Sequence, residues 1–495
     1  MSYETKNIRN IALLGHGNNG KTSLAESMLY VTGAIDRLGK VADGNTVCDY
    51  DAEEIARQIT IATSIAPVSY DGCKINVLDC PGFFDFVGDA LCALRAVEAG
   101  MIVTSAKDAG ESIPVGAQRC WNYLKAASLP VMFTISKCNE EHGDYFKALE
   151  TLKGKYGSIV CPVTIPTSDG TGVIDLVHNV AYITKGSKTE KGAVPAADAD
   201  HVEELRAELM EAAAGATEEL MEKFFETMEL EEADIVEGLK AGMKDRSVVP
   251  VFASDAMTNV GTVAMLQGIA DYCHAPVEKN DGVTGFVFKT VSDKFGKFSF
   301  VKVVSGKITA GMSLYNLRAS SNDKLGRMYT MCGKKSTEVT EACCGDIVAV
   351  GKLFVQIRLQ AQIACFPGNG HVVAVIGKKV EVGKSGVLLC FLDIGLNLCF
   401  VRGIFQKAVV QMQIGQVFAH HLLQHIVGFM QHLFQMRGAF LIDGLRHKRD
   451  VSDAETGCQQ NQKKDGGGRE PLLPGMAVSF GFVFFVCHSG HLNVM

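Results

Sequence analysis

The sequence predicts an α/β domain with a mostly parallel sheet and a helical insertion, followed by an all-β barrel domain and an irregular C-terminal tail. Three observations predict this class. Through residue 280, short apolar runs alternate with helical patterns, which is typical of a parallel sheet covered by helices. Residues 283–353 hold short β-rich runs separated by turn-forming residues, and after Leu353 the composition changes abruptly. We therefore expect domains over 1–280 and 283–353 and an atypical tail over 354–495.

Six apolar runs in the first segment have the length and composition of buried strands. They are Ile8–Leu14, Ala66–Tyr70, Lys74–Leu78, Met101–Ser105, Val131–Ile135 and Val249–Phe252. The long gap between the last two predicts an inserted subdomain at about 152–247. Within it, Val202–Ala213 and Glu218–Thr227 are rich in Ala, Glu and Leu, which predicts two exposed helices.

The second segment contains four runs with strand-like composition. They are Gly285–Val291, Phe298–Ser305, Leu325–Met331 and Ile347–Val350. The turns between them are built from Gly, Asn, Asp and Lys. This spacing of short strands and turns predicts a small β-barrel.

The tail differs from the rest of the chain in composition. Gln occurs 3 times in residues 1–353 and 13 times in residues 354–495, and eight of the thirteen His lie in the tail. The tail has 13 Lys and Arg against 8 Asp and Glu, whereas residues 1–353 have 35 against 47. Its apolar clusters follow neither the period of a strand nor that of a helix. We hypothesise that the tail is read from a shifted or antisense frame, or is disordered; translating the other frames beyond codon 353 tests this.

The composition also limits which cellular compartment and which binding partners we expect. The sixteen cysteines are scattered without a Cys-x-x-Cys pair, which is typical of reduced thiols in a cytosolic protein rather than of zinc or disulfide sites. The N-terminus lacks the apolar core of a signal peptide, and no segment sustains about 18 apolar residues. We therefore expect a cytoplasmic protein with no membrane partner. The net charge of −7 argues against general coating of nucleic acid and is compatible with a local basic docking face.

The most specific motif is the octapeptide Gly-His-Gly-Asn-Asn-Gly-Lys-Thr at residues 15–22, which joins an apolar strand to a helical stretch. In a loop of this pattern, successive backbone N–H groups curl around phosphate oxygens, and the helix N-terminus adds the positive end of its dipole. We expect Lys21 to reach the β- and γ-phosphates of a nucleoside triphosphate and the Thr22 hydroxyl to hold Mg²⁺. The candidate nucleotide contacts in this loop are His16, Gly17, Asn18, Asn19, Gly20, Lys21, Thr22 and Ser23.

Three further motifs complete a nucleotide-dependent switch. Asp79-Cys80-Pro81-Gly82 follows a strand, so that the Asp79 carboxylate can hold Mg²⁺ through water and the Gly82 N–H can sense the γ-phosphate. Thr60, in a polar loop that leads into a strand, is placed to close on Mg²⁺ and the γ-phosphate. Ser136-Lys137-Cys138-Asn139 ends another strand, where a P-loop GTPase reads its base. The candidate catalytic residues are Lys21, Thr60 and Gly82, and the candidate metal ligands are Thr22, Thr60 and Asp79.

With these motifs in this order, the sequence resembles the translational GTPases of the elongation factor G family. The resemblance is carried by the phosphate loop, Ile59-Thr60-Ile61, Asp79-x-Pro-Gly with Asp85-Phe86-Val87-Gly88, Val249-Pro250-Val251-Phe252 through Asn259-Val260-Gly261, and Val303-x-Ser305-Gly306. The sequence is more similar to the elongation-factor-G-like paralogues than to the main translocase. The resemblance stops at Leu353, where the family continues into three further domains, one of which enters the decoding site.

This resemblance implies a P-loop GTPase domain with GTP and Mg²⁺ as cofactors, followed by a second, β-barrel domain. It implies that Asp255 and Ala256 lie in the last nucleotide loop, where the Ala256 N–H serves the base oxygen. It also implies hydrolysis of GTP on the ribosome, with ribosomal RNA and the stalk proteins as partners.

Three motif positions depart from the family pattern. Phe83 stands where the family has the His that orients the attacking water; a phenyl ring has no lone pair or proton for this, so we expect slow hydrolysis. Asn139 stands where a carboxylate accepts two bonds from guanine, and its NH₂ would face a guanine donor at a cost of about 1–3 kcal/mol. Xanthine has a carbonyl there, which makes XTP the alternative ligand unless a loop shift brings Glu140 to the base. Ser136 replaces an Asn and is expected to lose bonds that brace the loop.

The leading hypothesis is a translation factor that binds and hydrolyses GTP on the ribosome. A nucleotide switch that barely hydrolyses is an alternative that Phe83 permits, and a translocation-incompetent fragment is an alternative that loss of the later domains favours. Ribosome protection of the tetracycline-resistance type is a further alternative within the family. Single-turnover hydrolysis with and without ribosomes separates the first two.

Overall fold

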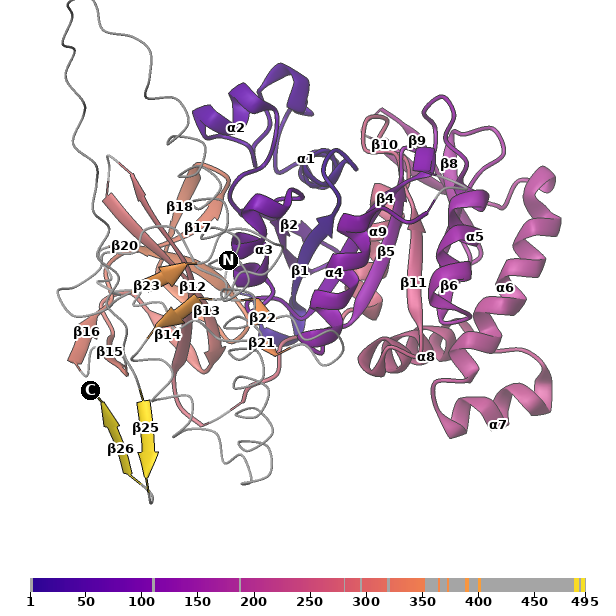
Figure 1. The fold of residues 1–495 in the computed structure, drawn as a ribbon. Coiled ribbons are helices and arrows are strands. Elements are labelled where there is room, and N and C mark those ends of the chain that lie inside the picture. Colours follow the sequence, from indigo (N-terminus) through magenta and orange to yellow (C-terminus); the bar gives the residue numbers. More distant parts are fainter. Residues whose placement is uncertain are drawn as a thin grey trace, which may run out of the picture. The chain divides into compact units, whose positions relative to one another are not determined.

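The computed structural model describes residues 3–351, apart from 109–111, 187, 280, 294–295 and 318–320, together with six short strands beyond residue 351 (Figure 1). Those strands form three antiparallel pairs: β21 (Ala364–Cys365) with β22 (Val372–Val373), β23 (Leu388–Cys390) with β24 (Cys399–Val401), and β25 (Phe485–His488) with β26 (His491–Val494). Apart from these strands, the tail over 354–495 and the hypothesis of a shifted frame or disorder lie outside the described residues.

The α/β domain is built on a seven-stranded sheet with the order β2-β3-β1-β4-β5-β11-β6. All neighbouring strands are parallel except β2 and β3, which form an antiparallel pair. The strands are β1 (Ile8–Gly15), β2 (Ser64–Tyr70), β3 (Cys73–Asp79), β4 (Ala99–Ser105), β5 (Val131–Ser136), β6 (Val160–Pro162) and β11 (Val249–Ala253). The six predicted strands are confirmed, and each end differs from its prediction by at most two residues.

Helices cover this sheet and make its central strands fully buried. Every residue of β1 and β4 is buried, so both strands are apolar along most of their length rather than alternating. α1 and α9 pack on each other and on β2, while α4 packs on β4 and α5 on β5. The helices of this part are α1 (Lys21–Val31), α2 (Ala52–Arg57), α3 (Val87–Ala93), α4 (Val115–Ala126), α5 (Tyr145–Tyr156) and α9 (Thr262–Tyr272). Short 3₁₀ turns are η1 (Thr5–Asn7), η2 (Val41–Asp43), η3 (Phe84–Phe86), η4 (Ala106–Asp108) and η5 (Ala196–Asp198).

The insertion contains both predicted helices and a sheet that was not predicted. The helices are α6 (Ala199–Ala214), α7 (Glu218–Thr227) and α8 (Glu232–Asp245). The sheet has the antiparallel order β10-β9-β8-β7, formed by β7 (Thr164–Pro166), β8 (Gly172–Asp175), β9 (Val180–Lys185) and β10 (Lys188–Gly192). The expected exposure holds for most of α7 but is wrong for one face of α6, because Leu209 and Ala213, one helical turn apart, are buried where α6 packs on α8.

The second segment folds into antiparallel sheets. Its five-stranded sheet has the order β12-β13-β20-β17-β18, and β14 pairs with β19 and β15 with β16. The strands are β12 (Thr284–Asp293), β13 (Gly296–Ser305), β14 (Lys307–Thr309), β15 (Ser313–Asn316), β16 (Ser321–Lys324), β17 (Met328–Cys332), β18 (Lys335–Val339), β19 (Glu341–Cys343) and β20 (Ile347–Gly351). Val303, Met328 and Val350 are fully buried in its own small core.

A buried polar network joins the second segment to the starts of β1 and β3. The Lys74 ammonium lies 2.7 and 2.9 Å from the two carboxylate oxygens of Asp346. The Asn10 amide donates to the Gly345 carbonyl at 2.8 Å, and Lys302 forms an ion pair with Glu98. This network lies at the amino ends of β1 and β3, so it leaves the carboxyl ends of the parallel strands open.

Candidate functional site

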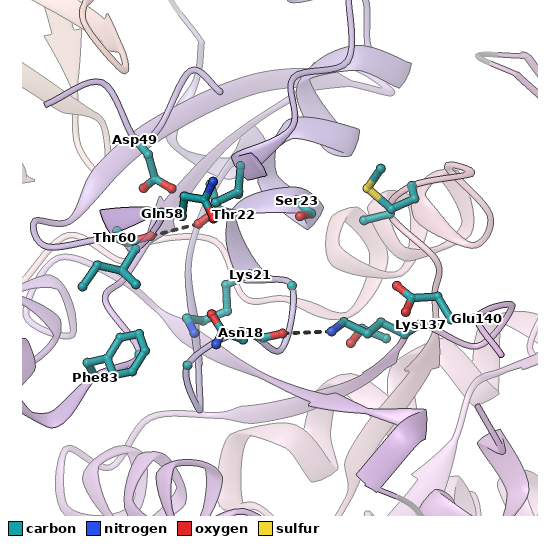
Figure 2. A pocket seen from close by; sticks show the side chains of 18 of the residues that line it. Asn18, Lys21, Thr22, Ser23, Asp49, Gln58, Thr60, Phe83, Lys137 and Glu140 are labelled. Carbon is teal, nitrogen blue, oxygen red and sulfur yellow. Dashed lines mark hydrogen bonds between the residues drawn. The ribbon is translucent and has the colours of Figure 1, made fainter. Parts of the chain in front are cut away.

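A cavity of about 270 Å³ lies at the carboxyl ends of the parallel strands, where open α/β sheets generally bind ligands (Figure 2). Loops after β1, β3, β5 and β11 line it, together with the segment that precedes β2. Twelve predicted site residues line this cavity: Gly17, Asn18, Gly20, Lys21, Thr22, Ser23, Thr60, Gly82, Ser136, Lys137, Asp255 and Ala256. The structure therefore brings together motifs that lie up to about 240 residues apart in the sequence.

Four predicted residues are not among those that line the cavity. His16 contributes its carbonyl to Lys21, and the Asn19 amide donates to the Val103 carbonyl at 3.3 Å. Asp79 is fully buried at the end of β3. Asn139 lines a neighbouring pocket instead.

The loop between β1 and α1 presents Lys21 to the cavity. The Lys21 ammonium donates to the His16 carbonyl at 2.7 Å, and burial lowers the pKa of this group. Gly82 approaches so closely that a Cβ atom there would lie 2.4 Å from the ammonium nitrogen. A buried ammonium at a helix N-terminus is suited to an anion such as a phosphate.

The same site holds oxygen atoms suited to a hard cation. The Thr22 and Thr60 hydroxyls lie 2.9 Å apart, from α1 and from the segment before β2 (Figure 2). Asp79 and Asp49 are buried, and among the described residues none of their four carboxylate oxygens has a hydrogen-bond partner. Hydroxyl and carboxylate oxygens are the ligands that Mg²⁺ prefers, so these residues fit that ion.

Both carboxyl groups resist ionisation in the absence of a cation. Burial raises the pKa of Asp79 to about 7, and repulsion from Asp49 adds to the shift. Burial likewise raises the pKa of Asp49 to about 6. Asp49 was missed by sequence reasoning because a single Asp in a loop carries no pattern of its own.

Local hydrogen bonds fix the segment that carries Thr60. Asp51 and Glu54 form a capping box at the start of α2. The buried Glu54 carboxylate also accepts from the backbone N–H groups of Ile61 and Ala62 at 3.0 Å each. These bonds hold the chain on both sides of α2 and so place the Thr60 hydroxyl beside Thr22.

Phe83 lies at the phosphate end of the cavity, as its position after Gly82 predicts. Its ring packs on Gly17, where an added Cβ atom would lie 2.7 Å from a ring carbon. The next residue, Phe84, lies 4.0 Å below the Arg119 guanidinium in a cation–π contact. Phe83 therefore places an aromatic ring at the position for which a water-orienting His was considered above, while the Phe84 ring packs on Arg119.

The loops after β5 and β11 form the other end of the cavity. The Lys137 ammonium donates to the Asn18 carbonyl at 3.0 Å, which ties this loop to the phosphate loop (Figure 2). The expectation that Ser136 loses its bracing bonds is wrong, because its hydroxyl lies 2.8 Å from the Asn19 carbonyl and 2.8 Å from the Thr104 carbonyl. The Asp255 carboxylate accepts from the Met257 N–H at 3.0 Å and so shapes its own turn.

Comparisons with known proteins agree with this geometry. Residues 6–275 match the family model of the elongation factor Tu GTP binding domain, and residues 282–358 match that of elongation factor G domain 2. Elongation factor G of Granulibacter bethesdensis is 29% identical over 373 residues, which cover 69% of this chain and 53% of that protein. A crystal structure of a protein from Thermus thermophilus matches with a TM-score of 0.65 and 31% identity, over 70% of this chain and 52% of that one.

The chain thus spans about half the length of the relatives it matches. In the described part of the chain, no helix combines the length and the apolar composition that a membrane span requires.

Proposed function

Since the chain belongs to the elongation factor G family of GTPases, with an elongation factor Tu GTP-binding domain followed by elongation factor G domain 2, we propose that it binds Mg²⁺ with GTP and hydrolyses the GTP on the ribosome. One observation carries the proposal. A buried ammonium, Lys21, lies at the same cavity as the buried Asp49, with the buried Asp79 at the end of β3, and the carboxylate oxygens of both Asp residues find no partner among the described residues. A triphosphate with its cation satisfies both groups at once.

Lys21 and the backbone of the phosphate loop bind the phosphate oxygens in this proposal. The ammonium already lies between the loop carbonyls and Gly82, so little rearrangement is needed to reach a terminal phosphate. The Gly82 N–H group senses that phosphate and reports its loss to the chain that follows.

Thr22, Thr60 and Asp79 hold the Mg²⁺, with Asp49 as an additional carboxylate on the same side. When bound, the ion neutralises charge on the phosphate oxygens. Its positive charge lowers the cost of ionising Asp79 and Asp49, whose pKa values are raised without it. Because Thr60 lies on the segment before β2, its contact with the ion adds to the bonds from Glu54 that already hold this segment, and loss of the triphosphate removes that added contact.

Phe83 sets the rate of hydrolysis in this proposal. Its ring accepts no proton and orients no water, so hydrolysis depends on positioning and charge. A water-orienting side chain raises the rate of such a reaction by roughly 10²–10⁴-fold, and we expect the rate of GTP hydrolysis to be lower by a factor in this range. The packing of the ring on Gly17 favours a second candidate function, a nucleotide switch that binds GTP and barely hydrolyses it.

We assign ribosomal RNA and the ribosomal stalk proteins as partners and the cytoplasm as the location. These assignments rest on membership of the family.

Phosphate release from limiting [γ-³²P]GTP, with the protein in excess, tests the proposal. We expect slow release by the protein alone and faster release when ribosomes are added. Binding of GTP without any release under either condition would support the switch instead. Equal release from ATP and GTP would contradict a GTPase.

A further inference from the structure

Asn139, at the position where a base-reading carboxylate is expected, is engaged away from the nucleotide cavity. Its side-chain amide donates to the Gly170 carbonyl at 2.8 Å, in the turn between β7 and β8. With this bond it lines a neighbouring pocket of about 400 Å³, together with Gly170 and Thr171. An amide nitrogen paired with a carbonyl fixes the orientation of the side chain.

Glu140, the next residue, is the acidic side chain that the loop after β5 contributes to the nucleotide cavity (Figure 2). The Glu140 N–H donates to the Lys137 carbonyl at 3.2 Å, and the Gly143 N–H donates to the Glu140 carbonyl at 2.9 Å. These bonds form a tight turn that carries Glu140 beside Lys137. Since the Lys137 ammonium binds the phosphate loop, the turn is tied to the phosphate site as well.

Lys107, from η4, forms an ion pair with the Glu140 carboxylate and so positions it. Its ammonium lies 2.6 Å from Oε2 of Glu140, and the two side chains are 40% and 33% exposed. No other hydrogen bond of this carboxylate occurs within the described residues, so Oε1 can accept a bond from a ligand. Glu140 therefore presents to the cavity a carboxylate of which one oxygen is held by Lys107. The Asn139 side chain is bound to Gly170, away from this cavity.

We propose that Glu140, and not Asn139, reads the base by accepting a hydrogen bond from the 2-amino group of guanine. A carboxylate is an acceptor only, so it favours a base edge that carries donors. Guanine offers N1–H and the 2-amino group there; hypoxanthine lacks the amino group, and xanthine presents a carbonyl that a carboxylate repels. This inference rests on the proposed function, because it concerns the base of the same nucleotide.

Measured affinities for GTP, ITP and XTP test the assignment, with Glu140→Gln as the key variant. We expect the parent to bind GTP roughly tenfold or more tighter than ITP or XTP, because one charge-assisted hydrogen bond is at stake. In Glu140→Gln, GTP affinity falls about tenfold and ITP affinity changes little, so that the ratio of the two approaches one. The matched control is Glu141→Gln, one residue along, whose side chain is 89% exposed and which removes the same charge.

Two outcomes overturn the assignment. One is a GTP-to-ITP ratio in Glu140→Gln that equals that of the parent. The other is XTP binding to the parent at least as tightly as GTP, with that preference lost in Asn139→Ala, which makes Asn139 the reader. Both differ from failure of the proposed function, in which the parent binds none of the three triphosphates. Thermal unfolding of each variant checks that the fold is intact.

Discussion

Replacing Asp79 by Asn is predicted to stabilise the metal-free protein while abolishing binding of Mg²⁺ with nucleotide. Asp79 is fully buried, and neither of its carboxylate oxygens is hydrogen-bonded to a described residue. Its charge is useful only when a cation is present. Asn has the same shape and no charge, so it removes the cost of burying the carboxylate and also removes the anionic ligand.

The size of this effect follows from the pKa of Asp79, which rises from 3.8 to about 7 on folding. Because the folded-state pKa lies above the unfolded value, the folded protein keeps the proton over a pH range in which the unfolded chain has lost it. Ionisation therefore penalises the folded state increasingly from about pH 4 to pH 7, and the penalty is complete above pH 7. At 1.36 kcal/mol per unit, it amounts to about 4 kcal/mol at pH 8 and about 2 kcal/mol at pH 5.

Urea unfolding of parent and Asp79→Asn in EDTA, at pH 8 and at pH 5, measures this difference. We expect the variant to be more stable at both pH values, with a larger gain at pH 8. A variant that is no more stable than the parent at pH 8 would show that burial of the ionised Asp79 does not destabilise the metal-free fold, as would a gain that is the same at both pH values. The parent should also gain stability as the pH is lowered from 8 towards 5 in EDTA and lose this trend when Mg²⁺ and GTP are present.

Phe83→His should raise the rate of single-turnover GTP hydrolysis by at least about 10²-fold, since it introduces a group that orients water, and an unchanged rate would show that the ring is not limiting. Asp346→Ala should lower the free energy of unfolding by about 3–5 kcal/mol, because it leaves the buried Lys74 ammonium unpaired. The double variant Lys74→Met with Asp346→Leu should recover most of this loss in the same urea experiment. Ser136→Ala should cost about 1–3 kcal/mol and weaken nucleotide binding, because it removes the one hydroxyl proton that the nearby carbonyls of Asn19 and Thr104 share. A neutral result by calorimetric titration and melting would mean that the hydroxyl braces nothing.

The strands of the main sheet were predictable because a strand that is buried on both faces consists of a continuous run of apolar residues. β1 and β4 are examples, since every residue in each is buried. The strands of the inserted sheet were not predictable from such runs. They have three to six residues, and β10, Lys188–Gly192, is almost wholly exposed and polar, so tertiary pairing rather than composition makes it a strand.

The phosphate end of the site was predictable because its spacing is rigid: a loop of fixed length must place Lys21 and Thr22 at the start of α1. The base end was less predictable. That Asn139 turns to Gly170 while Glu140 lines the cavity depends on a turn in a distant insertion, which local spacing does not encode. The bracing by Ser136 depends on how close the phosphate loop at Asn19 and β4 at Thr104 approach it, and Asp49 lines the cavity from the segment before α2.

We propose that a nucleoside triphosphate and its Mg²⁺ occupy the cavity between Lys21 and the paired hydroxyls of Thr22 and Thr60. This is tested by titration of a fluorescent GTP analogue into the parent and into Lys21→Ala, each with Mg²⁺ and with EDTA. We predict saturable binding by the parent that weakens in EDTA, and a loss of at least roughly tenfold in affinity for Lys21→Ala. Equal binding by the two proteins, or no binding by either, would contradict the account.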